Sequence, residues 1–425
     1  MQAMTTTQAF DMTQLPYLTA DAPPVPAVIK RDYEDFRVEE VPAYEPCGEG
    51  DHCFFMIEKK GLATMRAVSD IARKLGVPAK AIGLAGLKDA RAVAVQTLSV
   101  EHIDPGRIEN LQIPRIRILS VSRHKNKLKI GHLRGNRFHI KLRDTDPGRL
   151  DDIRSVCETL VKRGVPNYFG QQRFGTRGDT WQLGKAALGG DVMTVVDLML
   201  GRPGPHDTGD VLKARRLYDE REFAAAAKAW PYLFRDHARV GRVMERTKGN
   251  HRRAFHAIDA RLKKFFINAY QSYLFNQVLA KRIQSLDLVR TGDLAYKHDH
   301  GGVFLVEDES VESRRAAAFE ISPTGPIFGH KMTRPQGEPE QLEQAILESE
   351  GIQLEEFHKL KRMKLHGSRR PLRFRPDELD VSLGADALGP FIELAFTLPA
   401  GCYATMILRE TCKQGLQEGR GDEDG

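Results

Sequence analysis

The alternation of hydrophobic and polar residues predicts strands in the first quarter of the chain. FRVEEVPAYEP at 36–46 and HCFFMIEKK at 52–60 both alternate as strands do, and the turn CGEGD joins them. A third strand is predicted at 92–95, AVAV, directly after the Gly-containing stretch GLAGLKDAR at 83–91. The charged residues of that stretch are therefore expected at the mouth of a strand.

Helical spacing of apolar residues predicts helices elsewhere. Thr64 can cap a helix that ends at GVP, 76–78. Its apolar face would comprise Met65, Val68, Ile71, Ala72 and Leu75. Residues 180–260 are expected to form several short helices with Arg-rich surfaces, and 255–284 one long helix. The core positions of the long helix would be Ile258, Leu262, Phe265, Ala269 and Tyr273.

The two ends of the chain differ in composition from the rest. Residues 1–27 are rich in Thr, Ala and Pro and are expected to be extended or mobile, and 413–425 look like a polar tail. No repeat of 20 to 50 residues is evident. A length of 425 residues favours two domains between these ends.

Composition narrows the class of protein. Lys and Arg number 64 against 57 Asp and Glu, a formal net charge of +7, which is a modest bias toward polyanions. The five cysteines form no CxxC pair and are expected to be reduced, intracellular thiols. No leader peptide or run of 18 apolar residues is present, so the sequence predicts a soluble, cytoplasmic protein that does not bind membranes.

Positive charge is concentrated in two runs. RHKNKLKIGHLRGNRFHIKLR at 123–143 and KLKRMKLHGSRRPLRFR at 359–375 each contain eight Lys or Arg and no acid. In the first run Lys125, Lys127 and Lys129 would share one face of a strand. Such runs fit either a solvated basic face or a surface that binds nucleic-acid phosphates.

Asp89 is the only carboxylate in the stretch GLAGLKDARAVAVQ at 83–96, where it lies between Lys88 and Arg91. Asp is a favoured turn residue, so the pattern alone permits a structural turn as well as a reactive site. No phosphate-binding loop, dinucleotide fingerprint or zinc-deaminase signature accompanies it. His298, Asp299 and His300 are read as a loop rather than a metal site. We therefore expect a reaction without metal or cofactor.

Several stretches together resemble the TruD family of pseudouridine synthases. They occur in the family's order across most of the chain, which makes the set more specific than any single motif. The stretches are EDFRVEE (34–40), GEGDHCFF with KKGLAT (48–64), AGLKDARAVAVQ (85–96), RHKNKLKIGHLRGNRF (123–138), GVPNYFGQQRFG (164–175), YQSYLFNQVLA (270–280), SPTGPIFG (322–329) and LPAGCYATMILRE (398–410).

The resemblance implies roles for particular residues. The catalytic aspartate of the family's AGxKD motif corresponds to Asp89, and a lysine before its DFxVxE motif corresponds to Lys30. The residues implied to hold the target nucleotide are Phe36, Asn167, Phe169 and Tyr403. Lys88 and Arg91 are further candidates because nearby cations favour an ionised carboxylate. Ala90 and Ala94 depart from the family pattern, where a basic residue and Thr are frequent.

The resemblance also implies an α+β fold. The catalytic domain would be a mixed, largely antiparallel sheet built from residues 28–192 and 378–412, interrupted by an inserted TRUD domain at 193–377. The second basic run would then lie where the insertion ends.

The implied activity is isomerisation of uridine to pseudouridine, at uridine 13 in the tRNA D-arm, by a monomer with tRNA as its partner. Two other classes of function compete with it. A non-catalytic RNA-binding protein would not need Asp89, Asn167 and Phe169 intact. An RNA methyltransferase would need a Gly-rich strand-to-helix turn for S-adenosylmethionine, and the sequence has none.

Overall fold

The computed structural model describes residues 9–419, and within them all side chains except those of residues 360 and 362. These residues divide into two compact units. The helical unit comprises 9–16 and 166–373, and the sheet unit comprises 17–165 and 374–419. The chain crosses from one unit to the other near the short strands β8 (Val165–Pro166) and β13 (Arg373–Phe374).

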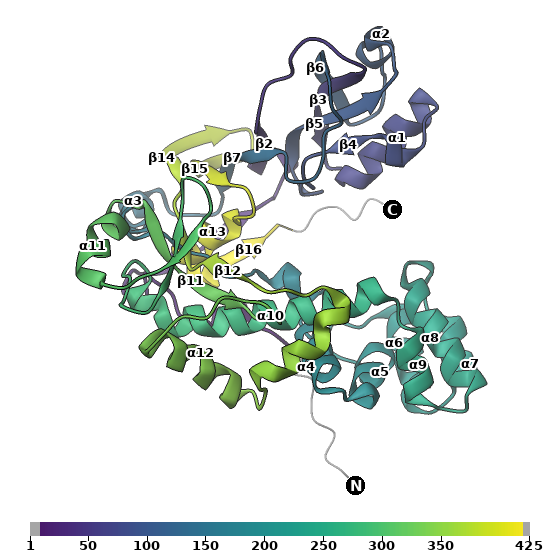
Figure 1. Ribbon diagram of the computed structural model, residues 1–425. Coiled ribbons are helices and arrows are strands. Elements are labelled where there is room, and N and C mark those ends of the chain that lie inside the picture. Colours follow the sequence, from purple (N-terminus) through teal and green to yellow (C-terminus); the bar gives the residue numbers. More distant parts are fainter. Residues whose placement is uncertain (1–8, 420–425) are drawn as a thin grey trace. The chain divides into compact units, whose positions relative to one another are not determined.

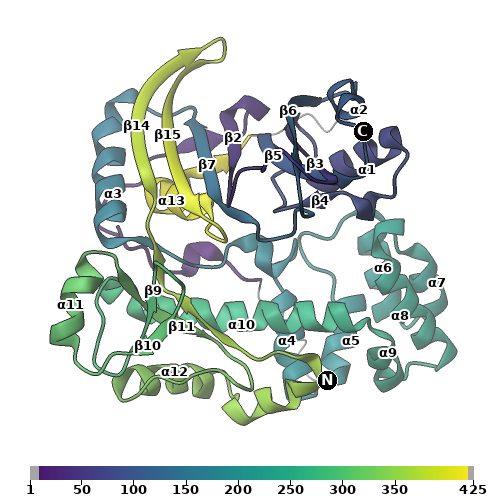
Figure 2. The ribbon, with the colours of Figure 1, turned by 45° about the horizontal axis from the view of Figure 1, so that its top comes forward.

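The sheet unit is built on one large sheet, drawn in Figures 1 and 2. Its strand order is β14-β15-β7-β2-β5-β3-β6, with β4 paired to β5. All neighbours are antiparallel except β2 and β5, which are parallel. The strands are β2 (Phe36–Pro42), β3 (His52–Lys60), β4 (Gly83–Leu84), β5 (Val93–Glu101), β6 (Ile116–His124), β7 (Leu133–Leu142), β14 (Asp377–Asp386) and β15 (Gly389–Pro399). The mixed, largely antiparallel sheet predicted for an α+β protein is thus confirmed.

Helices complete the sheet unit. The apolar residues of α1 (Thr64–Leu75) pack with β3, β5 and α2 (Pro105–Glu109) in one hydrophobic core. At the other end of the sheet, α3 (Leu150–Arg163) contacts β14 and α13 (Ala404–Cys412). A separate pair of parallel strands joins β1 (Ala27–Ile29) to β16 (Leu416–Glu418), so the last described residues return to the start of the unit.

The helix α1 matches its predicted bounds but not its predicted cap. It ends at Leu75, and the C-cap residue Gly76 has a φ of 74°, the left-handed conformation that glycine adopts without a side-chain penalty. The N-cap residue is Ala63, and Thr64 is the first helical residue. The Thr64 hydroxyl is engaged instead by the loop before β5, where it accepts from the backbone N–H of Lys88 at 2.9 Å.

The helical unit is organised around α10 (Ala260–Arg282), the long helix in Figure 2. The helix α4 (Thr180–Gly189) crosses it closely at Gly184, where a Cβ would lie 2.1 Å from the carbonyl oxygen of Phe266. Beside α10 lies a four-stranded sheet in the order β10-β9-β11-β12. The remaining elements here are β9 (Leu294–Lys297), β10 (Val303–Leu305), α11 (Glu309–Ala317), β11 (Ile321–Ile327), α12 (Glu338–Ser349), η8 (Leu354–Met363) and β12 (Ser368–Pro371).

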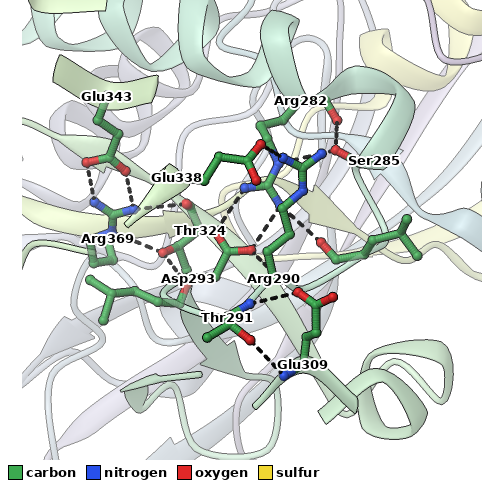
Figure 3. Close-up of polar contacts among 12 residues, drawn as sticks. Arg282, Ser285, Arg290, Thr291, Asp293, Glu309, Thr324, Glu338, Glu343 and Arg369 are labelled. Atoms are coloured by element: carbon green, nitrogen blue, oxygen red, sulfur yellow. Dashed lines mark hydrogen bonds and ion pairs between the residues drawn. The ribbon is translucent and has the colours of Figure 1, made fainter. Parts of the chain in front are cut away.

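Buried ion pairs hold this part of the helical unit together. Arg282 at the end of α10 donates to both carboxylate oxygens of Asp293, at 2.9 and 3.0 Å (Figure 3). Arg369 of β12 likewise meets both oxygens of Glu343, at 2.6 and 3.0 Å. Buried charges require such pairing because desolvation of a lone ion is costly.

A group of short helices forms the other end of the helical unit, with its own hydrophobic core. It comprises α5 (Val192–Leu200), α6 (Gly209–Asp219), α7 (Phe223–Ala229), α8 (Arg235–Arg246) and α9 (His251–Ala257). The predicted single helix over 255–284 is wrong, because α9 ends at Ala257 and Asp259 caps a new helix at Ala260. Phe265, predicted to be core, is 39% exposed, whereas its neighbour Phe266 is buried.

Both chain ends are more ordered than their compositions suggested, as far as the structure describes them. In the segment expected to be extended or mobile, Leu18 and Val25 are buried, and the Thr19 hydroxyl donates to the Glu410 carboxylate at 2.8 Å. The expected polar tail contains η9 (Lys413–Gly415) and β16. The rest of the expected terminal segments, 1–8 and 420–425, lies outside the described residues.

The compact units divide the chain at other residues than the expected domains. Residues 166–192 fall in the helical unit, although the insertion was expected to begin at 193. The reason is the close packing of α4 on α10, which apolar patterning within α4 alone does not reveal. Within residues 9–419, no helix is long and apolar enough to cross a membrane.

Candidate active site

Asp89 lies on a loop that leads into β5, and its carboxylate is held from two sides. One oxygen, Oδ1, accepts the backbone N–H of Arg91 at 3.0 Å, the bond expected of an Asp in a turn. The other, Oδ2, lies 2.5 Å from the ammonium nitrogen of Lys30. The side chain of Asp89 keeps 30% of its surface exposed. Asp89 is therefore both a turn residue and an accessible, ion-paired carboxylate.

Lys30 is the cation that meets Asp89. It follows β1 with a φ of 56°, a left-handed conformation that is unfavourable for a residue with a side chain. Its ammonium lies 4.6 Å from the centre of the Phe36 ring and 3.6 Å from Oε1 of Glu418. With only 7% of its side chain exposed, Lys30 is aimed inward by this backbone geometry. Strained backbone of this kind is concentrated at functional sites.

Lys88 has a different partner. Its ammonium donates to Oε2 of Glu40 at 2.6 Å, and both side chains are buried. This ion pair ties the Asp89 loop to β2. Lys88 therefore fixes the loop and is not the residue paired with the Asp89 carboxylate.

Arg91 connects the loop to the backbone that follows β1 and β16, at the shared C-terminal end of this parallel pair. Its guanidinium donates to the carbonyl oxygen of Lys30 at 3.1 Å and to the carbonyl oxygen of Gly419. One guanidinium nitrogen also lies 3.9 Å from the Glu418 carboxylate. Arg91 thus orders the backbone that carries Lys30.

Lys59 is a residue of the site that the sequence patterns did not single out. It is fully buried, and its ammonium donates to the carbonyl oxygens of Asp89, at 2.8 Å, and Leu62, at 2.6 Å. Burial lowers the pKa of Lys59 to about 8, although the nearby Asp89 charge acts in the opposite direction. The alternation of β3 could have indicated that Lys59 is buried, because Phe55, Ile57 and Lys59 all point to the buried face.

Two candidate aromatic residues of the sheet unit differ in access. Phe36 is 5% exposed, and its ring meets the edge of Phe138 with the centroids 6.1 Å apart. Tyr403, at the N-cap of α13, is 37% exposed. Tyr403 therefore offers ring surface to a ligand, whereas Phe36 mainly supports Lys30 in this arrangement.

Asn167 and Phe169 belong to the helical unit and are arranged around Arg370. The Asn167 amide donates to the carbonyl oxygen of Pro371 at 2.9 Å and accepts from the Arg370 guanidinium. That guanidinium lies 4.4 Å from the centre of the Phe169 ring. Asn276 of α10 fixes the backbone of Phe169 through bonds of 2.8 and 3.0 Å. The structure thus brings these two candidates together, as it does Lys30, Phe36, Asp89 and Arg91 in the sheet unit.

The two basic runs differ from their predicted form. Residues 125–132 connect β6 to β7 as a loop, so the predicted strand with Lys125, Lys127 and Lys129 on one face is wrong. In the second run, Arg369 is bound to Glu343 and Arg373 is buried with its guanidinium on the Ser322 hydroxyl at 2.9 Å. Part of the positive charge that suggested a binding surface therefore serves the interior.

The His298 side chain is also accounted for by the fold. It lies 2.8 Å from the Ser322 hydroxyl, and burial lowers the pKa of His298 to about 4. Among residues 9–419, no group of three or more His, Cys, Asp or Glu side chains is arranged to hold a metal ion.

Comparison with known proteins gives a consistent result over nearly the whole chain. Residues 12–411 match the family model described as tRNA pseudouridine synthase D (TruD). A protein of Geobacter sulfurreducens named tRNA pseudouridine synthase D is 42% identical over 398 residues, which cover 94% of this chain and 97% of that protein. A protein of the same name from an Anaeromyxobacter species is 36% identical, over 97% of this chain and 100% of its own.

A solved structure agrees with these sequence matches. The crystal structure of the putative tRNA pseudouridine synthase D (TruD) from Methanosarcina mazei superposes with a TM-score of 0.81 at 27% sequence identity. The match covers 94% of this chain and 96% of that one. Family, relatives and fold therefore point to the same class of protein.

Proposed function

Since this chain belongs to the tRNA pseudouridine synthase D family, and is thus an isomerase that converts uridine to pseudouridine, we propose that it modifies uridine 13 of the tRNA D-arm with Asp89 as the catalytic carboxylate and without a cofactor. The observation that carries the assignment is the 2.5 Å ion pair between Lys30 and the partly exposed Asp89. It supplies an accessible carboxylate, paired with a cation, on a loop held from several sides.

The chemistry balances without an external reagent. The bond between the ribose carbon C1′ and N1 of uracil breaks, the base rotates, and a new bond forms between C1′ and C5. The C5 proton leaves and N1 gains a proton, so the product is an isomer of the substrate. Whether the carboxylate attacks the sugar, attacks the base or removes a sugar proton, it must be ionised. Lys30 places a positive charge directly beside the Asp89 carboxylate.

The loop geometry supports this role for Asp89. Lys59 binds the backbone carbonyl of Asp89, the preceding residue Lys88 is paired with Glu40, and Arg91 donates its backbone N–H to the carboxylate. A reactive group held in the productive geometry lowers the barrier, because less entropy is lost on the way to the transition state.

Binding requires the uridine to leave its stack, at a cost of a few kcal/mol. Stacking on one aromatic ring returns roughly 1 to 3 kcal/mol. Tyr403, with its exposed ring, is proposed to supply that contact. Phe36, Asn167 and Phe169 are proposed to shape the nucleotide site, Phe169 through the guanidinium that covers its ring.

The test compares Asp89→Asn with wild type on a tRNA transcript that contains a single D-arm target. Carbodiimide treatment followed by primer extension maps pseudouridine, and we expect no product at position 13 with the variant. Asp151→Asn, which removes a carboxylate that is 92% exposed on α3, is the control and should react as wild type does. Pseudouridine formed by Asp89→Asn would exclude Asp89 as the catalytic residue.

We further propose that the enzyme acts as a monomer in the cytoplasm. The five free cysteines suit a reducing compartment. Light scattering coupled to size-exclusion chromatography would measure the molar mass in solution, and a value near twice 47.8 kDa would contradict the monomer.

A further inference from the structure

The helix α8 carries an unusually regular row of arginines. Arg235, Arg239, Arg242 and Arg246 are spaced by four, three and four residues, which places them along one side of the helix. All four are exposed. The opposite side is the buried one, where Val240, Gly241 and Met244 face the core of the short helices. We call the four residues the arginine stripe.

Few acidic residues of α8 are present to neutralise the charge of the arginine stripe. Asp236 pairs with Arg239 at 2.6 Å, and Glu245 is the other acid of the helix. Just beyond the stripe, Lys248, Arg252 and Arg253 are exposed as well. Residues 232–253 thus contain seven Lys or Arg against two Asp or Glu. An excess of this size on one surface creates a local potential that attracts polyanions.

An exposed aromatic side chain lies at the N-terminal end of the stripe. Tyr232, in the short turn η6 (Tyr232–Phe234), is 76% exposed, and the next residue, Leu233, is 89% exposed. The Arg235 guanidinium lies 3.7 Å from the centre of the Tyr232 ring. A ring backed by a guanidinium is a platform on which an unpaired nucleobase can stack.

We propose that the arginine stripe and Tyr232 bind a part of the RNA substrate outside the stem that carries the target uridine. The stripe would contact phosphates over about 16 Å of helix length. Arginine suits this task because its planar guanidinium matches phosphate oxygens. Tyr232 would stack on an unpaired base at the end of that contact. This inference rests on the proposed function, because it assumes that the substrate is a folded RNA.

The test separates binding of the rest of the RNA from binding of the target stem. The triple variant Arg239→Gln, Arg242→Gln and Arg246→Gln keeps a helix-forming residue at each position. Kinetics and electrophoretic binding are measured on full-length tRNA and on the isolated D-arm stem-loop. We expect the KM and Kd for full-length tRNA to rise about 10- to 100-fold at low salt, with kcat unchanged. The values for the stem-loop should stay as in wild type.

A matched control removes the same charge elsewhere in the helical unit. Lys281→Gln, Arg314→Gln and Lys331→Gln change three exposed cations outside the short helices. Arg314 belongs to α11, at the opposite end of the unit from α8 in both Figures 1 and 2. The control should leave both RNAs bound as in wild type. Circular dichroism and the thermal midpoint verify that both triple variants are folded.

Salt dependence and the aromatic residue provide two further measurements. The slope of log Kd against log salt concentration should fall by roughly 2 to 3 in the stripe variant, about one for each phosphate that its side chains no longer neutralise. Tyr232→Ala should weaken full-length tRNA binding by about 5- to 150-fold. Tyr232→Phe should keep the affinity because it keeps the ring.

The outcomes decide separately between this inference and the proposed function. Unchanged affinity for full-length tRNA in the stripe variant, or an equal loss on the stem-loop, overturns the inference. Wild-type protein that binds tRNA through the stripe but forms no pseudouridine at position 13 leaves the inference intact and rejects the proposed target.

Discussion

Asp89 gains its setting from residues that are distant in sequence. Lys30 neutralises the carboxylate, Lys59 holds its backbone carbonyl, and Arg91 supports the segment on which Lys30 lies. Each of these cations binds a different atom of the site. Removing any one of them would therefore affect a different property: the ion pair of the carboxylate, the position of the loop, or the order of the segment that carries Lys30.

The buried Lys59 predicts a specific dependence of stability on pH. Its pKa is lowered from 10.5 to about 8 in the folded protein, so between these values the unfolded chain binds more protons than the folded one. The free energy of unfolding of wild type, relative to Lys59→Met, should therefore rise with pH over this window, with a slope of up to ~1.4 kcal/mol per pH unit. Urea unfolding at several pH values from about 7.5 to about 10 measures it.

Lys60→Met is the control for this experiment. Lys60 is the next residue of β3, but its side chain is 46% exposed and its pKa is raised by its hydrogen bond to Glu34. The corresponding difference for Lys60→Met should not increase with pH, because the folded state holds that proton more tightly than the unfolded chain does. A flat difference for Lys59→Met would show that Lys59 titrates normally in the folded protein.

Tyr403 permits a test of stacking without loss of the fold. The side chain is proposed to act through its exposed ring, so Tyr403→Phe should keep most of kcat/KM. Tyr403→Ala should lower kcat/KM by about 5- to 150-fold, the equivalent of roughly 1 to 3 kcal/mol. Equal and complete loss in both variants, measured on the same tRNA, would instead assign an essential role to the hydroxyl.

At the scale of elements, β16 contributes more than its three residues suggest. It pairs with β1 just before Lys30, places Glu418 near the Lys30 ammonium, and leads to the Gly419 carbonyl that accepts from Arg91. A chain that stops after Gly415 should fold, because it keeps the large sheet and its helices. We expect its kcat to fall roughly 10- to 100-fold, since small displacements of a reactive group are enough for such losses.

The control is a chain that stops after Gly419, which keeps β16 and its bonds to β1 and Arg91. Its kcat should equal that of wild type, and the thermal midpoint of each truncated chain shows whether the fold is retained. Equal kcat in the two truncated chains would mean that β16 does not order the site.

The sequence predicts an element well when the interactions that form it lie within that segment, and poorly when they involve residues far along the chain. Alternation located β3 at its observed bounds and showed where β5 begins near Asp89. It did not locate β16, whose short polar sequence forms a strand only because β1 offers a partner far along the chain. The break between α9 and α10 was missed because the apolar spacing continues through Ile258, while the cap at Asp259 resets the helix.

The candidate site shows the same division between local and distant causes. The motif around Asp89 indicated the carboxylate, but spacing could not decide among Lys30, Lys88 and Arg91 as its partner. The partner of Asp89 is decided by Glu40, which forms an ion pair with Lys88, and by the left-handed backbone at Lys30. The second basic run overstated the positive charge at the surface for a related reason. The sequence does not reveal that Arg369 and Arg373 are bound to partners inside the protein.

On the scale of the whole molecule, the sheet unit is assembled from two separated stretches of chain. The strand β7 has β2 on one side and β15 on the other, and β15 follows only after residues 166–373. The first stretch contains Asp89, Lys30 and Lys59, and the second supplies β14, β15, α13 and β16. Neither stretch contains the complete sheet.

This arrangement has a consequence for synthesis on the ribosome. At about 5 to 20 residues per second, roughly 10 to 50 s separate the emergence of β7 from that of β15. During that interval the edge of β7 lacks the partner that it has in the finished sheet, and open strand edges are prone to aggregation. A nascent chain that terminates early therefore carries Asp89, the proposed catalytic residue, on an unfinished sheet, which makes it a substrate for chaperones and proteases.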